Sequence, residues 1–292
     1  MAQLSNAEAR PPLRNTPEYR EYIKIKLRAA PWWLYAIFAI AIFTFIAIFT
    51  NIPFQKAFLF IKAGLSVTIT TTLMAFAFAL FLGLLTGLGR ISDNTFFKNL
   101  ATLYVELIRG IPMLVLIFFI AFVGIPGVVT GIKSLGAWLV QVGAPGIGGW
   151  MAAVKNEVPM NTRAVIALST TYGAFLAEIF RAGIQSIGRG QMEAARSQGM
   201  SYWQAMRYII LPQAIRNVLP ALGNDFISML KDSSLVSVLA VRDITQIAKL
   251  YAGRTFQFQQ AYITLAVLYL TMTVLLSFLM KYIEKRIQKN ER

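Results

Sequence analysis

Long apolar runs that carry almost no charge are the feature that most constrains this sequence. The run Trp32–Thr50 has no charged residue, and similar runs recur along the chain. Of the 292 residues, 57% are hydrophobic and 14% are charged. A water-soluble domain of this size would lack the polar side chains to cover so much apolar surface. Because the runs are continuous and do not alternate, they predict an all-α integral membrane protein and not a β-barrel.

The hydropathy pattern predicts about six transmembrane helices of about 20 residues each. They are expected at residues 32–50, 64–88, 105–125, 163–182, 217–240 and 260–280. The polar segment before the first run does not have the pattern of a cleavable signal peptide. Lys and Arg are more frequent before residue 32, in 89–104, in 181–216 and in the tail than in the other connections. This bias predicts that both termini are cytoplasmic.

The predicted organisation has four parts. Residues 1–31 form a cytoplasmic polar tail with a short amphipathic helix, 32–50 an extra N-terminal span, 64–283 the main transmembrane domain and 284–292 a cytoplasmic tail. Within the main domain, 126–162 is an exterior insertion and 183–215 a cytoplasmic loop. The insertion is rich in Gly and Pro. Two interpretations stay open for it: a short re-entrant or interfacial helix with Trp138 and Trp150 at the headgroups, or ordinary loop packing.

The composition also excludes several kinds of function. The net charge of +15 is spread in clusters between apolar spans, which argues against a nucleic-acid partner. The chain has no Cys and no His, so disulfides, zinc sites of the usual type and catalysis by Ser-His-Asp or Cys-His are excluded. No phosphate-binding GxxxxGK[ST] loop is present. We therefore expect no catalytic residue, metal or cofactor in this chain, and any ATP to be bound by a partner.

The run from Glu193 to Pro212 is the most polar long stretch between apolar segments. Glu193, Ala194 and Ala195 favour a helix, which Gly199 would end in a left-handed conformation. Ser201 can cap a second helix, with Gln204 at the capping-box spacing. Pro212 would end or kink that second helix. The pattern predicts two short helices joined by a glycine bend, a stiff object suited to a groove on a soluble partner.

This run resembles the cytoplasmic loop of ATP-binding-cassette importer permeases. The residues that match the pattern of that loop are Glu193, Ala194, Ala195, Gly199, Ile209, Leu211 and Pro212. The resemblance implies that the loop is the coupling helix, which docks on an ATPase subunit. It also implies a five-helix permease core, to which the span 32–50 and the insertion 126–162 would be additions.

Three further stretches resemble permeases for polar amino acids, the histidine, glutamine, glutamate, arginine and opine group. They are Tyr104 to Phe119, Tyr172 to Ala195 and Leu211 to Val241. The resemblance implies import of a polar amino acid across a bacterial inner membrane. It further implies an extracytoplasmic amino-acid-binding protein, ABC ATPase subunits and a second permease copy, identical or related.

A polar stripe is expected within the fifth span, on one side of the helix. It consists of Asn224, Asp225, Ser228, Lys231 and Asp232. Charges at that depth are costly and should face protein or a water-filled path. The stripe is interpreted as part of the translocation pathway, or as a structural network in which Lys231 pairs with a carboxylate. In a third interpretation Asp232 caps a fresh helical start at Ser233-Ser234, which gives a broken helix.

Two acid–base pairs recur at a spacing of three residues near the cytoplasmic ends of spans. They are Glu106 with Arg109, and Glu178 with Arg181. This spacing places each pair on one face of a helix. We interpret them as gate or interfacial ion pairs, with direct substrate contact as the less favoured interpretation.

Two other classes of function compete with an ATP-driven importer. An ion-coupled secondary amino-acid transporter would need coupling carboxylates and two repeats in one chain, and no repeat is seen here. A membrane enzyme would need catalytic groups at a suitable spacing, and no paired carboxylates stand out. The sequence therefore favours the importer.

Overall fold

The computed structural model describes residues 32–155 and 157–289. In this part of the chain all regular structure is helical, which confirms the predicted all-α fold. The chain divides into two units, Met1–Asn51 and Ile52–Arg292. The amphipathic helix predicted before residue 32 lies outside the described residues, as do the last three residues of the tail.

The described part of the first unit is one helix, α2 (Trp32–Thr50), with the bounds expected from the sequence. Large apolar side chains are exposed along it, including those of Phe38, Ile42, Phe43 and Phe45. A helix that is apolar on every side needs an apolar surrounding such as lipid. That α2 forms an extra span stays a prediction.

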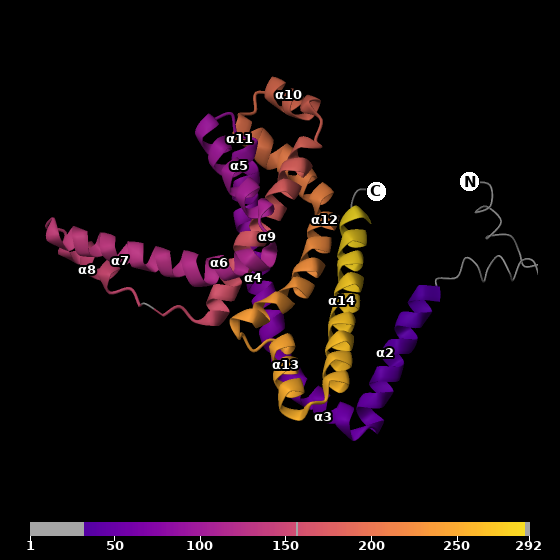
Figure 1. The fold of residues 1–292 in the computed structure, drawn as a ribbon. Helices are drawn as coiled ribbons and strands as arrows, with labels where there is room; N and C mark the ends of the chain where they lie inside the picture. The colour runs from indigo at the N-terminus through magenta and orange to yellow at the C-terminus, as the bar shows by residue number, and fades with distance from the viewer. Residues whose placement is uncertain (1–31, 156, 290–292) are drawn as a thin grey trace, which may run out of the picture. The chain divides into compact units, whose positions relative to one another are not determined.

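The regular structure in the described part of the second unit is helical, with short connections between the helices (Figure 1). Its first half contains α3 (Ile52–Ile61), the 3₁₀ turn η2 (Lys62–Gly64), α4 (Leu65–Arg90), α5 (Thr95–Gly110), α6 (Met113–Phe119), the π-helical turn η3 (Ile120–Gly124), α7 (Ile125–Gln141) and α8 (Pro145–Ala152). Its second half contains α9 (Met160–Gln185), α10 (Arg189–Ser197), α11 (Tyr202–Ala205), the π-helical turn η4 (Met206–Ile210), α12 (Leu211–Asp232), the 3₁₀ helix η5 (Ser233–Leu239), α13 (Ile244–Thr255) and α14 (Phe258–Lys289).

Four helical stretches of the described residues are long and apolar enough to cross a membrane. They are Ile52–Arg90, Met113–Gln141, Met160–Gln185 and Phe258–Arg286. The predicted spans 163–182 and 260–280 fall within two of them. The predicted span 64–88 also falls within one, although helical structure there begins already at Ile52.

The predicted span 105–125 is interrupted in the structure. It begins inside α5, and the chain then leaves the helix at Ile111, whose φ and ψ of −110° and 137° are extended. Pro112 follows directly and causes the break, because a residue before proline avoids the helical region. The helix that resumes at Met113 runs on to Gln141 through a π-helical turn. The apolar character of the segment concealed this break from hydropathy.

The predicted span 217–240 is likewise not one regular helix. The α-helical part begins earlier, at Leu211, and ends at Asp232, where the tighter 3₁₀ helix η5 replaces it. Ala240 then adopts a left-handed conformation with φ of 57°, which ends η5. The segment from Asp232 to Val241 is therefore a bend rather than the end of a straight membrane helix.

The insertion 126–162 is largely helical, which corrects the interpretation of it as ordinary loop packing. Helices α7 and α8 pack against each other as a hairpin. Gly136 and Gly148 lie at their contact, since a Cβ on Gly136 would come within 2.8 Å of the Gly148 carbonyl oxygen. Gly and Pro are tolerated in membrane helices, so their abundance here was not a reliable loop signal.

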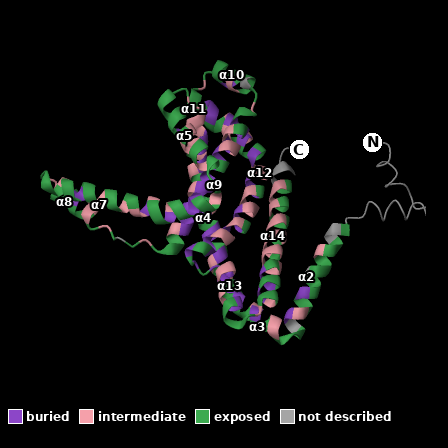
Figure 2. Ribbon diagram, viewed as in Figure 1, coloured by how far each residue is buried: buried purple, intermediate pink, exposed green. Residues whose placement is uncertain are grey.

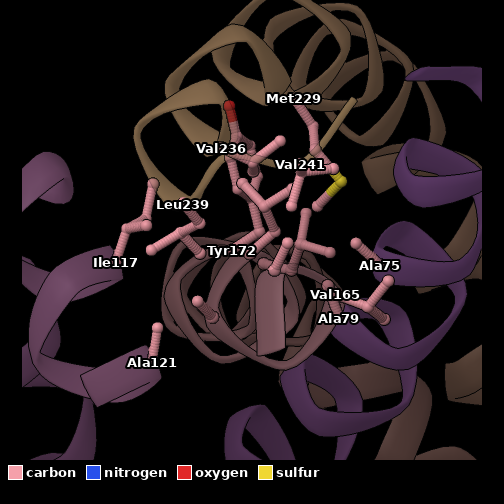
Figure 3. Close-up of a cluster of buried hydrophobic side chains, with 14 of the residues drawn as sticks. Ala75, Ala79, Ile117, Ala121, Val165, Tyr172, Met229, Val236, Leu239 and Val241 are labelled. Carbon is pink, nitrogen blue, oxygen red and sulfur yellow. The ribbon is translucent and has the colours of Figure 1, made fainter. Parts of the chain in front are cut away.

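Close packing of α4 on α9 forms the centre of the second unit. A Cβ on Gly83 would lie 2.7 Å from the Leu176 Cβ, so only glycine permits this approach. Helix α9 is rich in buried residues (Figure 2). Side chains of η5 and of the ends of α6 and α12 complete the apolar cluster on it, with Tyr172 in the middle (Figure 3). Helix α9 is thus the rigid element that connects the two ends of the unit.

Candidate functional site

Residues 193–212 form the helix–bend–helix that the sequence predicts. Helix α10 ends where Gly199 takes a φ of 84°, the left-handed region. The Gly199 amide donates to the Arg196 carbonyl, and the Met200 amide donates to the Ala195 carbonyl. Ser201 then begins α11 with a complete capping box, in which its backbone amide donates to the Gln204 side chain at 2.8 Å. These local contacts favour a fixed angle between the two helices.

The second helix does not end at Pro212. Helix α11 passes through the π-helical turn η4 into α12, and Pro212 lies in the first turn of α12. Proline inside a helix removes one backbone hydrogen bond, and the wider π-helical turn η4 just before Pro212 accommodates this change. The bend at Gly199 is therefore followed by continuous helix from Tyr202 to Asp232.

The matched loop residues fall into two groups by exposure. Ala195 is buried, and Ile209 and Leu211 are half-buried against a small cluster formed by Ile184, Met206, Ile210 and Ala214. Glu193, Ala194, Gly199 and Pro212 are exposed. We call this unit, residues 189–212, the knob. It has its own apolar foot and an exposed outer surface.

The outer surface of the knob is aromatic and basic. Tyr202, Trp203 and Tyr208 are exposed, and the Arg207 guanidinium lies 5.7 Å from the centre of the Tyr208 ring. Exposed Trp, Tyr and Arg side chains are enriched at the centres of protein interfaces. A cleft of about 630 Å³ opens beside the foot of the knob, between it and the α4–α5 connection.

Five charged side chains meet where α4, α5 and α9 approach one another. Glu178 on α9 accepts hydrogen bonds from Arg90 on α4 and from Arg181 on its own helix. The Arg109 Nη1 lies 4.0 Å from the Glu178 Oε2, and the Arg90 Nη2 lies 3.8 Å from the Glu106 Oε1. Glu178 is therefore the hub of an ion cluster that joins three helices.

The ion cluster confirms one predicted pair and changes the other. Glu178 and Arg181 pair as expected, whereas Glu106 and Arg109 each pair across to another helix, with Arg90 and Glu178. Arg90 was missed, since the sequence placed it in a loop after the span 64–88. The sequence did contain one indication that Arg90 belongs to the cluster: Arg90 lies at the same end of its predicted span as the two acid–base pairs. Glu106 is 70% exposed, so its contribution is small.

The polar stripe of α12 is only partly engaged. The Asp232 Oδ2 accepts a hydrogen bond of 2.6 Å from the hydroxyl of the buried Tyr172 on α9, a partner the sequence did not suggest. Asp232 does not cap the following turn, although the helix does change there to 3₁₀. Within the described residues no ion pair involves Lys231, so the structural network expected for it is not formed there.

Exposure along the rest of the stripe varies. Asn224 and Lys231 are exposed, whereas Asp225 and Ser228 are half-buried. Among residues 32–155 and 157–289, no group of three or more acidic side chains could hold a metal ion. Among the described residues, no hydrogen bond or ion pair involves the exposed side chains of Asn224 and Lys231.

Comparison with known protein families identifies the family of this chain. Residues 79–289 match the model of the binding-protein-dependent transport system inner membrane component. The chain belongs to this family. The permease is thus an inner-membrane component of a transport system, and the matched region includes the ion cluster, the knob and the polar stripe.

Curated relatives agree over most of the permease. It is 38% identical over 223 residues to the probable glutamine ABC transporter permease protein GlnM of Bacillus subtilis, which covers 76% of this chain and 91% of the relative. It is 31% identical over 225 residues to the glutamine transport system permease protein GlnP of Escherichia coli, which covers 77% and 91%. These relatives are permease subunits of ABC transporters.

Solved structures have the same fold. One is titled as an amino acid ABC transporter with histidines; it is 38% identical, has a TM-score of 0.63 and covers 78% of the permease and 94% of that chain. The MetNI methionine ABC transporter, at 17% identity and a TM-score of 0.58, agrees in fold alone.

Proposed function

We propose that the permease carries a polar amino acid into the cell through a complex powered by ATP on separate subunits. Relatives named for glutamine and arginine transport support this class of substrate. An extracytoplasmic binding protein would deliver the amino acid. The permease itself would carry no catalytic group and would form the pathway together with a second copy or a related permease.

The observation that carries the proposal is the construction of the knob. Two helices held at a fixed angle by the Gly199 bend and the Ser201 capping box protrude with exposed aromatic and basic side chains. A partner that grips such a knob can push α10 without bending it, because the local contacts resist deformation. The push would reach α12 through the continuous helix from Tyr202 to Asp232.

The ion cluster and the polar stripe each have a separate role in this mechanism. Glu178 lies two turns before the end of α9, the helix that leads into the knob, and binds Arg90 on α4. We assign the cluster, Arg90, Glu106, Arg109, Glu178 and Arg181, to holding α4, α5 and α9 together on the cytoplasmic side. The exposed polar positions of α12, Asn224 and Lys231, would face the pathway.

Cross-linking from the knob tests the docking. The chain has no cysteine, so Trp203→Cys and Arg207→Cys introduce unique positions for a photoreactive thiol label. In vesicles of the native membrane, both labels should capture the ATPase subunit. Labels at Phe256→Cys, an equally exposed aromatic position in the turn between α13 and α14, should not. Capture of the ATPase from position 256, or none from the knob, would contradict the proposal.

A further inference from the structure

The proposed transport mechanism gives no role to the α7–α8 hairpin. Helix α7 makes its packing contacts with α8 and with the turn η3 that precedes it. In Figure 1 the hairpin extends sideways from the long helices α4, α9 and α14. The surroundings of this hairpin are therefore considered separately from the coupling to ATP.

Length and composition alone would make α7 part of a membrane span, because Met113–Gln141 is long and predominantly apolar. The return path excludes this. After α7 the chain must come back to α9, since the Arg163 Nη1 donates a 2.8 Å hydrogen bond to the Ala121 carbonyl at the base of the hairpin. Helix α8 has 8 residues and is about 12 Å long, too short to recross a hydrocarbon core of about 30 Å.

The rest of the return path belongs outside the hydrocarbon. Residues 153–155 and 157–159 are not helical, and the segment contains the charged residues Lys155 and Glu157. Non-helical backbone does not face lipid in the hydrocarbon core, because its polar groups would lack hydrogen-bond partners. The beginning and the end of the hairpin thus lie at the same membrane surface. That surface is at the N-terminal end of α9, opposite the knob.

The surface of the hairpin is apolar on both helices. Trp138 on α7 is 55% exposed, and Ile147 and Trp150 on α8 are 68% and 74% exposed. Much of the hairpin is coloured as exposed in Figure 2. From Ile125 to Val154, Lys133 is the only charged residue in the sequence. Exposure of such an apolar surface to water is unfavourable. The boundary between lipid headgroups and acyl chains accommodates it, and Trp residues in particular prefer that boundary.

We propose that the α7–α8 hairpin is a membrane-surface paddle that lies flat in the headgroup–acyl boundary and binds phospholipid. Gly136 and Gly148 allow the two helices of the paddle to pack closely. A Cβ on either glycine would collide with the carbonyl oxygen of the other. The two hydrogen bonds that Arg163 donates, to the Ala121 and Val158 carbonyls, tie both of its ends to α9. The paddle would anchor the pathway-forming helix α9 at a fixed depth in the bilayer.

Spin labels at single cysteines measure the depth directly. Trp138→Cys, Ile147→Cys and Trp150→Cys are labelled with a nitroxide, and the permease is assembled with its partners in phospholipid vesicles. Collision with oxygen and with a nickel chelate is then compared. Leu275→Cys, exposed near the middle of α14, supplies the hydrocarbon value, and Asp93→Cys, exposed in the α4–α5 connection, supplies the aqueous value.

All three paddle positions should lie between the two standards, with oxygen favoured over the nickel chelate. Values like that of position 93 would overturn the proposal, and so would depths like that of position 275, which would make α7 a span. Protection from the nickel chelate that appears only when the binding protein is added would also overturn it, in favour of a protein partner.

A glycine pair tests the construction of the paddle. Gly136→Val should separate the helices and increase the mobility of a label at Ile147→Cys. Gly131→Val, on the same helix with no atom within 4 Å of its Cβ position, should leave the mobility unchanged. Equal mobility in the two variants would contradict the assigned hairpin contact.

Discussion

At the scale of single residues, the knob and the ion cluster depend on positions that no similar residue can fill. Gly199 has the left-handed φ of 84° that the bend needs. Arg90 reaches from α4 to Glu178 on α9, a link between residues 88 positions apart. The first is a local requirement readable from the sequence. The second depends on how two helices pack, and no local spacing encodes it.

Gly199→Val should uncouple transport from ATP. A β-branched residue in the left-handed region costs about 1–2 kcal/mol, which changes the equilibrium constant for forming the bent knob by about 5- to 30-fold. We expect ATP-dependent uptake to fall, because fewer permeases hold the bent knob, while the amount of permease inserted in the membrane stays normal. Gly190→Val, in the same loop but without the left-handed conformation, is the control and should keep most of the activity.

The Gly199 prediction is checked by ATP-dependent uptake in vesicles and by the amount of permease in the membrane. Uptake that persists with normal ATP dependence in Gly199→Val would show that the bend has no role in docking.

Arg90→Ala should destabilise the permease more than Arg109→Ala. The Arg90 side chain is 14% exposed and bonded to Glu178, whereas that of Arg109 is 43% exposed and 4.0 Å away. Loss of the more buried partner should cost about 1–3 kcal/mol in the free energy of unfolding, since a shielded charge pair is removed. The measurement is thermal unfolding in detergent of both variants and of Glu178→Gln.

The Arg90 result has a double-variant check. If Arg90 acts through Glu178, Arg90→Ala should add little to the effect of Glu178→Gln. Fully additive effects, or a larger effect of Arg109→Ala, would count against Glu178 as the hub.

At the scale of elements, α9 is the part on which the others are assembled. Gly83 and Gly87 of α4 contact its backbone, the cluster around Tyr172 covers another side, and its C-terminal end leads into the knob. Displacement of α9 would therefore disturb the ion cluster and the position of the knob together.

Gly83→Ala tests the α4–α9 contact by the sign of its effect. In open helix, glycine to alanine stabilises by up to about 1 kcal/mol. At Gly83 the new methyl would lie 2.7 Å from the Leu176 Cβ, so overpacking should destabilise by about 1–3 kcal/mol. Gly131→Ala, where space is open, should be neutral or stabilising. The unfolding temperatures of both variants are measured. A higher unfolding temperature for Gly83→Ala would contradict the close contact between α4 and α9.

Some local signals were read correctly from the sequence, whereas contacts between separate helices were not predicted. The bend at Gly199 and the capping box at Ser201 follow from residue chemistry within four positions. The break at Pro112 carried a local signal as well, but the apolar run around it concealed it. The pairing of Glu106 with Arg90, and of Tyr172 with Asp232, required the packing of separate helices. The sequence did not predict that the paddle is a helical hairpin. Its Gly residues would indicate a loop in a water-soluble protein, whereas in a membrane protein they allow helices to pack closely.

At the scale of the whole molecule, the account makes the permease a passive lever and pathway whose motor is another protein. The knob, the ion cluster and α12 belong to one family of inner-membrane transport components. The sequence contains no GxxxxGK[ST] phosphate-binding loop. In the proposed function the energy of ATP enters through the knob.

Uptake by the reconstituted system shows whether transport depends on an ATPase outside this chain. The permease is placed in proteoliposomes with or without its ATPase subunits, with binding protein outside and radiolabelled glutamine or arginine as substrate. The account predicts accumulation only when the ATPase, ATP and the binding protein are all present, and none from a proton or sodium gradient alone. Accumulation by the permease alone in response to an ion gradient would contradict it.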